Sequence, residues 1–213
     1  MTERQMTIQG HGEVHSAPDR AVLTFRASES HKEYETAVMR LNKSVEKLRQ
    51  DLEWLGIKRT DLKTTNFAVA AQYDYALGKQ RFTGFQAAHD LRLEIPFTQI
   101  LLNQVLNKIA NGQSDVEVAI HFEISQEEEL KRQAIELAVQ DAQNKAATIA
   151  GAAMVKLGKI VAIQYGVVEV RVEYEPQAFR AMAKAEAVAA APDIQPQDIR
   201  AEETVMMTWE ILD

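Results

Sequence analysis

The sequence predicts an α+β protein in which a mainly antiparallel β-sheet carries three helices packed on one face. Three segments repeat apolar residues at helical spacing, and the segments around them alternate apolar and polar residues, as half-buried strands do. Because these strands alternate instead of running continuously apolar, we expect an antiparallel sheet whose other face is in water. The elements follow the order β-β-α-β-β-α-β-α-β-β, which is an α+β architecture.

Two strands and a long helix are expected first. The strands cover Met6–Val14 and residues 21–27, and Ala17-Pro18-Asp19 favours a turn between them. In the helix, apolar residues spaced 4, 3, 4, 3, 4 and 3 apart form one seam: Tyr34, Val38, Leu41, Val45, Leu48, Leu52 and Leu55. Gly56 can end the helix in a left-handed conformation. A coiled coil needs the same seam, but this one lasts only about three heptads, so the helix is expected to pack on its own sheet.

The middle of the chain predicts a hairpin, a short helix and a strand. Residues 62–75 and 82–95 have a strand pattern, and residues 76–80 between them look like a hairpin turn. Apolar residues at 102, 105, 106 and 109 predict a short helix that stops near Asn111-Gly112. Residues 116–124 then alternate as a half-buried strand.

A third helix is expected from Ser125, which forms a capping-box pattern with Glu128. It carries alanines at spacing four, which would let it lie close to its support: Ala134, Ala138, Ala142, Ala146 and Ala150. This column could equally serve as an oligomer interface, although a helix-sheet contact within the chain is favoured. Strand patterns follow at residues 160–165, 168–174 and 205–211.

The alanine-rich stretch 176–196, with proline at both ends, is expected to be a long excursion that is mobile or contacts a partner. At 213 residues the chain can form one large domain or two small ones. We expect one domain over residues 1–213, with sub-domains at about 1–96 and 97–213 as the alternative.

The composition excludes several classes of function. Lys and Arg total 24 and Asp and Glu total 31, which gives a net charge of −7 and argues against nucleic-acid binding. The absence of cysteine excludes disulfides, a thiol nucleophile and thiolate zinc sites. No apolar run approaches the roughly 20 residues of a membrane span, and Met1–Ser16 lacks the core of a secretory signal. We therefore expect no membrane span and a cytoplasmic chain as written, or a periplasmic one if a signal segment was trimmed.

One group of residues could bind a metal ion. His11, Glu13 and His15 point to the same side of a predicted strand, and imidazole and carboxylate ligands suit zinc or another divalent cation. However, each step of two residues along a strand spans about 6 to 7 Å, which is long for joint coordination without a bulge. A solvated strand face is therefore the favoured interpretation, and we predict no metal site. His31, His89 and His121 are isolated and need no catalytic role.

Other motifs predict no catalytic site. No serine lies in a Gly-x-Ser-x-Gly turn, and Gly10-His11-Gly12 is too short for a dinucleotide or phosphate loop, so these glycines are expected to serve a bulge or a close backbone approach. The carboxylate pairs Glu127-Glu128 and Glu202-Glu203 lie in polar contexts and are expected to be solvated. An aromatic group flanks the predicted hairpin and is expected to be cross-strand packing, with a small binding surface as the alternative: Tyr73, Tyr75, Phe82 and Phe85.

Several motifs occur in a familiar order along nearly the whole chain. The first has the form Gly-x-Gly-x-Val followed by Pro-Asp-x-Ala: Gly10, Gly12, Val14, Pro18, Asp19 and Ala21. Leu55-Gly56-Ile57, residues 61–67, Tyr73 with Tyr75, and Gly84-Phe85 follow. Later come the Ala-x-x-Asp-Ala-x-x-Lys-Ala pattern over residues 138–146, Leu157-Gly158, residues 181–183 and residues 196–199. Together these segments resemble the SIMPL domain family.

The chain departs from the family pattern at three places. Ala70-Ala71 replaces the proline usual before the tyrosine pair, Met154 stands where glycine is common, and Gln197 follows Pro196 in place of glycine. Members of the family include a periplasmic immunogenic antigen, an oxidative-stress defence protein and a vertebrate signalling adaptor. The resemblance implies a homo-oligomer without catalytic residues or a cofactor.

Three functional hypotheses follow. The first is a non-enzymatic, self-associating protein with a role in envelope integrity or oxidative-stress defence. The second is an adaptor that binds a protein partner through the excursion 176–196. The third is a metal-dependent enzyme that uses His11, Glu13 and His15.

Overall fold

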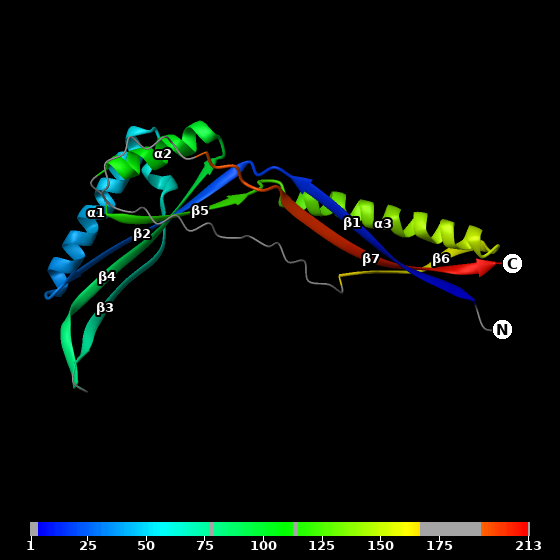
Figure 1. The fold of residues 1–213 in the computed structure, drawn as a ribbon, viewed down its shortest axis with the longest axis horizontal. Coiled ribbons are helices and arrows are strands. Elements are labelled where there is room, and N and C mark those ends of the chain that lie inside the picture. Colours follow the sequence, from blue (N-terminus) through cyan, green and yellow to red (C-terminus); the bar gives the residue numbers. More distant parts are fainter. Residues whose placement is uncertain (1–3, 77–78, 113–114, 167–192, 213) are drawn as a thin grey trace. The chain divides into compact units, whose positions relative to one another are not determined.

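The computed structural model describes residues 4–76, 79–112, 115–166 and 193–212 (Figure 1). The α+β class and the predicted element order are confirmed. The chain runs through β1 (Gln5–Ser16), β2 (Arg20–His31), α1 (Tyr34–Trp54), the 3-10 turn η1 (Arg59–Asp61), β3 (Lys63–Ala76), β4 (Lys79–Pro96), α2 (Gln99–Asn111), β5 (Val116–Glu123), α3 (Glu127–Ala152), β6 (Lys156–Tyr165) and β7 (Ile199–Leu212).

The strands form two antiparallel sheets instead of one, in the orders β1-β7-β6 and β3-β4-β2-β5. Each sheet belongs to its own compact unit: the three-stranded unit contains β1, α3, β6 and β7, and the four-stranded unit contains β2, α1, β3, β4, α2 and β5. This division differs from the alternative of two sub-domains that meet near residue 96, because β1 pairs with β7 from the other end of the chain. Thus β1 and β2 are consecutive in sequence but do not pair with each other.

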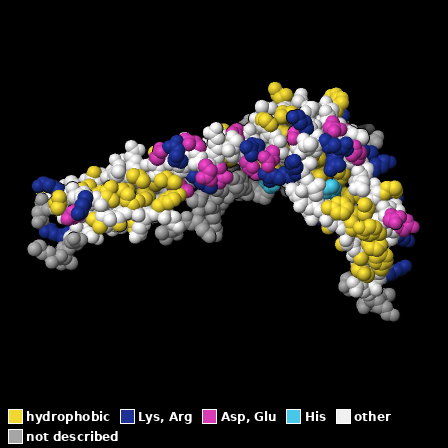
Figure 2. Space-filling model, turned by 180° about the vertical axis from the view of Figure 1, so that it is seen from behind, with side chains coloured by type: hydrophobic (Ala, Val, Ile, Leu, Met, Phe, Trp, Pro, Cys, Tyr) yellow, Lys and Arg dark blue, Asp and Glu magenta, His cyan; other side chains and the backbone are white. Residues whose placement is uncertain are grey.

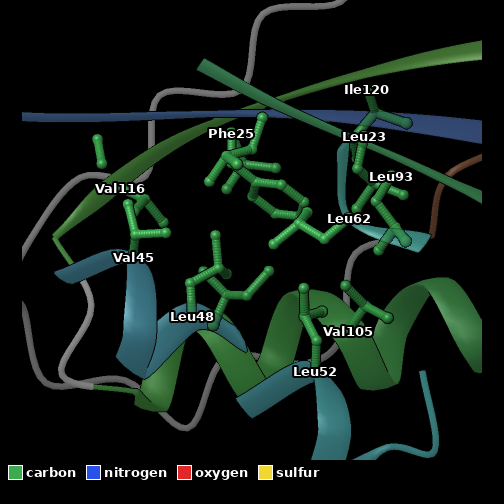
Figure 3. Close-up of a cluster of buried hydrophobic side chains, with 14 of the residues drawn as sticks. Leu23, Phe25, Val45, Leu48, Leu52, Leu62, Leu93, Val105, Val116 and Ile120 are labelled. Atoms are coloured by element: carbon green, nitrogen blue, oxygen red, sulfur yellow. The ribbon is translucent and has the colours of Figure 1, made fainter. Parts of the chain in front are cut away.

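The core of the four-stranded unit lies between its sheet and the two helices α1 and α2. The predicted seam of α1 supplies Leu41, Val45, Leu48 and Leu52, all buried. Figure 3 shows Leu23 and Phe25 of β2 pointing toward these leucines and toward Val105 of α2. Gly56 follows the end of α1 with φ of 81°, as the sequence predicts.

In the three-stranded unit, α3 lies against β1 and β7 through its alanine column, all five members of which are buried. Gly10 and Gly12 of β1 face this column. A Cβ built on Gly10 would lie 2.0 Å from the carbonyl oxygen of Ala138, and one on Gly12 would lie 2.0 Å from that of Ala134. The predicted close backbone approach is therefore confirmed, and so is the contact of the alanine column within the chain.

The start of α3 corrects one prediction. The helix begins at Glu127, its N-cap residue is Gln126, and no side chain caps it. Ser125 lies one residue too early, because the first helical backbone bond runs from Leu130 to the carbonyl of Gln126. The acidic first turn, Glu127 to Glu129, is present as expected and favours the positive end of the helix dipole.

Two predicted segments fall partly or wholly outside the described residues. The strand expected at 168–174 is among them, and so is the excursion up to residue 192. Of the rest of the excursion, Ile194 is buried in the core of the four-stranded unit. Among the described helices, none combines the length and the apolar character that crossing a membrane requires.

Met154 gives the first testable prediction. It follows the C-cap residue of α3, has φ of 56°, and is 93% exposed, so it adopts a left-handed conformation without packing contacts that would offset the strain. We expect Met154→Gly to raise the free energy of unfolding by about 1 kcal/mol, because glycine adopts this conformation without a Cβ clash. Urea denaturation followed by circular dichroism measures it.

Met39 provides the control, since it is also exposed but lies inside α1. Met39→Gly should lower stability by about 1 kcal/mol, the usual effect of glycine in a helix interior. If both substitutions changed the free energy of unfolding in the same direction, the left-handed conformation assigned to Met154 would be contradicted.

Candidate functional site

An exposed row of aromatic rings lies on the β3–β4 hairpin of the four-stranded unit. Neighbouring rings meet edge to face: the centroids of Tyr73 and Phe82 are 5.8 Å apart, those of Phe82 and Phe85 5.2 Å, and those of Phe85 and Tyr34 5.6 Å. Tyr73 and Phe82 are register partners, so the predicted cross-strand packing is confirmed for this pair. The side chain of Tyr75 lies outside the described part. Sequence patterns missed Tyr34, which joins the row from the first turn of α1.

We call these four rings the aromatic row; three of them are about half exposed, and Phe85 is partly buried against the core of the four-stranded unit. Tyr34, Tyr73 and Phe82 are 51%, 50% and 46% exposed, and Phe67 on β3 is 48% exposed. Figure 2 shows hydrophobic side chains as a band along this hairpin. Edge-to-face pairs stabilise their rings by about 0.5–1.5 kcal/mol each, but half-exposed rings keep apolar area available for a further contact.

The three-stranded unit also exposes large apolar side chains. On β6 and α3, six of them are 42% to 57% exposed: Leu137, Ile149, Ile160, Val161, Ile163 and Tyr165. Each unit therefore carries apolar surface that its own core does not bury.

The proposed metal ligands His11, Glu13 and His15 lie on one face of β1, as predicted, but they join a different arrangement. The carboxylate of Glu13 accepts hydrogen bonds from His15 Nε2 at 2.6 Å and from Arg200 Nη2 of β7 at 2.9 Å, and it forms an ion pair with Arg200 Nε at 2.7 Å. Arg200 also binds Glu202 at 2.9 Å, and His11 Nδ1 lies 3.4 Å from Glu202. We call these five residues the polar ladder.

The polar ladder is an exposed ion-pair network across β1 and β7. The hydrogen bond from His15, reinforced by Arg200, lowers the pKa of Glu13, so its carboxylate stays ionised. Both oxygens of Glu13 are thereby occupied by cationic or imidazole donors. In the part of the chain that the structure describes, no three His, Asp or Glu side chains are arranged to hold a metal ion.

Glu203 corrects the expectation of a solvated carboxylate pair. Glu202 is exposed, but Glu203 is only 6% exposed and lies opposite Gly12. Partial burial raises the pKa of Tyr165, and the carboxylate of Glu203, which accepts a hydrogen bond from the Tyr165 hydroxyl, raises it further. The sequence contained a signal for this burial: Glu203 is an even number of residues from Val205, Met207 and Trp209, so it lies on the same, buried face of the strand.

Two of the three isolated histidines, His89 and His31, have structural partners. His89 is buried, its Nε2 lies 2.8 Å from the Thr64 hydroxyl, and its ring meets Phe67 edge to face at 5.4 Å. Burial, together with the nearby positive charge of Arg49, lowers the pKa of His89. His31 accepts a hydrogen bond from the backbone N–H of Glu33 at 3.1 Å, just before α1.

These features define a class of protein: an α+β chain of two helix-covered antiparallel sheets, with a glycine-alanine contact in one unit and an exposed aromatic hairpin in the other. A family model, SIMPL, described as a protein of unknown function (DUF541), matches residues 6–209. The chain therefore belongs to the SIMPL family, and the resemblance found in its motifs is confirmed.

A curated relative agrees with this assignment. The chain is 24% identical over 213 residues to "Uncharacterized protein YggE" of Edwardsiella ictaluri (strain 93-146). The similarity covers 97% of this chain and 86% of that relative.

Proposed function

We propose that this SIMPL protein is a non-enzymatic, self-associating protein that contributes to cell-envelope integrity or oxidative-stress defence. The observation that carries the self-association is the aromatic row, whose rings meet edge to face while Tyr34, Tyr73 and Phe82 remain about half exposed. Apolar surface of this kind is typical of a protein interface. The exposed apolar side chains of β6 and α3 add apolar area in the other unit.

The non-enzymatic part of the proposal is supported by the pairing of the candidate chemical groups with one another. Glu13, the central carboxylate of the polar ladder, is engaged by Arg200 and His15. The buried Glu203 is bound by Tyr165. Such pairing suits a strand face held in register better than a proton donor or nucleophile.

Light scattering across a concentration series tests the self-association. We expect the average mass to rise with concentration. Phe82→Asp should lower it by placing a charge in the aromatic row, whereas Ile100→Asp should not, because Ile100 lies on α2 outside the row and is 72% exposed. A chain that stays strictly monomeric at high concentration would overturn the proposal.

The proposed cellular role, which includes a location in the cell envelope, rests on the family resemblance. Deletion of the gene in its host is expected to increase sensitivity to peroxide or to envelope-disrupting agents. The native gene should restore tolerance, and a gene encoding Phe82→Asp should restore less. Unchanged tolerance of both stresses after deletion would contradict this role.

A further inference from the structure

The free edge of the four-stranded sheet has an unusual composition. β3 is the edge strand of the order β3-β4-β2-β5. Its central stretch, residues 66–72, has the sequence NFAVAAQ, with no charged residue and no proline, and all but Val69 and Gln72 are exposed. Proteins commonly guard such edges with charges, prolines or covering side chains, because an open edge pairs with another strand.

The other unit shows how this chain closes an edge. β1 is an edge strand of the order β1-β7-β6, and α3 lies against it. The Asp141 carboxylate accepts a hydrogen bond from the backbone N–H of His11 at 2.8 Å, and Lys145 donates one to the carbonyl of Gln9 at 3.4 Å. In the described part of the chain, no comparable side chain covers the outer backbone groups of β3.

A bulge sets which side chains of β3 share a face. Thr64 lies opposite Leu91 and Asn66 opposite Asp90, so Thr65 is an extra residue that shifts the alternation. As a result, Lys63 and Asp74 lie on the same face, away from α1, although one number is odd and the other even. Phe67, Val69, Ala71 and Tyr73 lie on the opposite face, because their partners on β4 include the buried His89 and Ala87.

This pattern is self-complementary. If two copies of β3 pair antiparallel about a two-fold axis at Val69, residues 68, 67 and 66 meet residues 70, 71 and 72 of the second copy. With Thr65 bulged out, Thr64 then meets Tyr73, and Lys63 meets Asp74 of the second copy. In every pair the two side chains lie on the same face of the sheet, as antiparallel pairing requires. The large side chain of Phe67 lies opposite the small one of Ala71, and the amide of Asn66 lies opposite that of Gln72. Because of the two-fold axis, the oppositely charged pair of Lys63 and Asp74 occurs twice.

Neighbouring registers lack this charge match. An axis at Ala68 would place Lys63 opposite Gln72, and an axis at Ala70 would place it opposite Ala76. Within the chain, Lys63 lies across from Arg92 on β4, whose guanidinium is already paired with Glu94 and Glu123. Asp74 from a second copy would place a carboxylate opposite Lys63, and opposite charges across strands stabilise a sheet.

We infer that β3 is the site of self-association, and that two copies join edge to edge about Val69 to form a continuous eight-stranded antiparallel sheet. The inference rests on the proposed self-association and names its surface. The axis would bring Phe67 and Tyr73 of both copies onto one face, and because Tyr73 belongs to the aromatic row, the exposed band of Figure 2 would continue from one copy into the other.

Cysteine cross-linking tests the axis, since the native chain has no cysteine. Val69→Cys places a single thiol at the axis, and mild oxidation or a short bis-maleimide should give a covalent dimer of the full chain. Asn42→Cys, exposed on α1, should give none. A mixture of Lys63→Cys and Asp74→Cys chains should cross-link, whereas each alone should do so at least tenfold less.

Charge reversal is an independent test that leaves the half-buried Val69 in place. Lys63→Glu should weaken dimerisation about tenfold at low salt, because two like-charged pairs replace two opposite ones, and so should Asp74→Lys. The double variant, Lys63→Glu with Asp74→Lys, should restore the native dissociation constant. Circular dichroism and thermal melts establish that each variant is folded.

The outcomes separate the two proposals. A chain that assembles in light scattering but shows neither Val69→Cys dimers nor charge-swap rescue would overturn the β3 interface and leave self-association standing. A strict monomer without cross-links would overturn both. Cross-linking of Val69→Cys to another protein but not to itself would assign the edge to a different strand and also overturn the inference.

Discussion

Replacing Gly12 with alanine is expected to destabilise the three-stranded unit strongly. The new Cβ would lie 2.0 Å from the carbonyl oxygen of Ala134 and 2.4 Å from the backbone nitrogen of Ala138. Both atoms belong to the backbone of α3, so no side-chain rotation can relieve the clash and the helix must move off the sheet. We expect the free energy of unfolding to fall by about 3 kcal/mol, at the upper end for overpacking.

The measurement is urea denaturation monitored by far-ultraviolet circular dichroism, with Gly151→Ala as the matched control. Gly151 lies in the same helix, and apart from its chain neighbours and the adjacent helix backbone no atom lies within 4 Å of the position its Cβ would take. Alanine there should be neutral or stabilise by about 0.5 kcal/mol, because it favours the helix. If Gly12→Ala proved as stable as the parent, α3 could not lie against β1 at the observed separation.

The elements that sequence patterns predicted best are those whose signal is local. The α1 seam is buried at Leu41, Leu48 and Leu52, as its spacing requires, and α2 ends at Asn111, where the glycine signal stood. Local periodicity reports which face of an element meets a core. It does not report which core that is.

The division into two sheets could not be predicted for that reason. The strands before and after Pro18 have similar alternation, yet the first pairs with β7 near the other end of the chain and the second with β4 and β5. Such pairing is decided by packing between residues far apart in sequence, and alternation is silent about it. The glycines of β1 were a partial signal, because a strand residue without a Cβ indicates close approach of another backbone.

The candidate sites show the same limit. The common face of His11, Glu13 and His15 followed from the period of two, but Arg200, which pairs with Glu13, and Glu202, which pairs with Arg200 and His11, come from β7. Tyr34 joins the aromatic row from α1, and nothing near it in sequence indicates Phe85 as its neighbour. Glu203 is different: it was expected to be solvated because of its charge, although it alternates in step with the apolar residues of its strand, which are buried.

Phe25→Ala is expected to be the most destabilising change in the four-stranded unit. Phe25 is 0% exposed and lies on the interior strand β2, with Leu91 of β4 and Val118 of β5 as its register partners. Figure 3 shows its ring between the sheet and Leu48 of α1. Removing the ring leaves a cavity that strands on both sides prevent from closing, so we expect a loss of about 3–5 kcal/mol.

Phe67→Ala is the control for this prediction, because Phe67 belongs to the same sheet but lies on the edge strand and is 48% exposed. It gives up part of its burial and one edge-to-face contact with His89, so its loss should be about 1 kcal/mol. Urea midpoints of the two variants measure the difference under identical conditions. Equal losses would show that the core is not centred on β2. A large loss for Phe25→Ala alone would show that the fold depends on the interior strand and not on the side chains of the edge strand β3. The exposed side chains of β3 would then be available to contact a second copy.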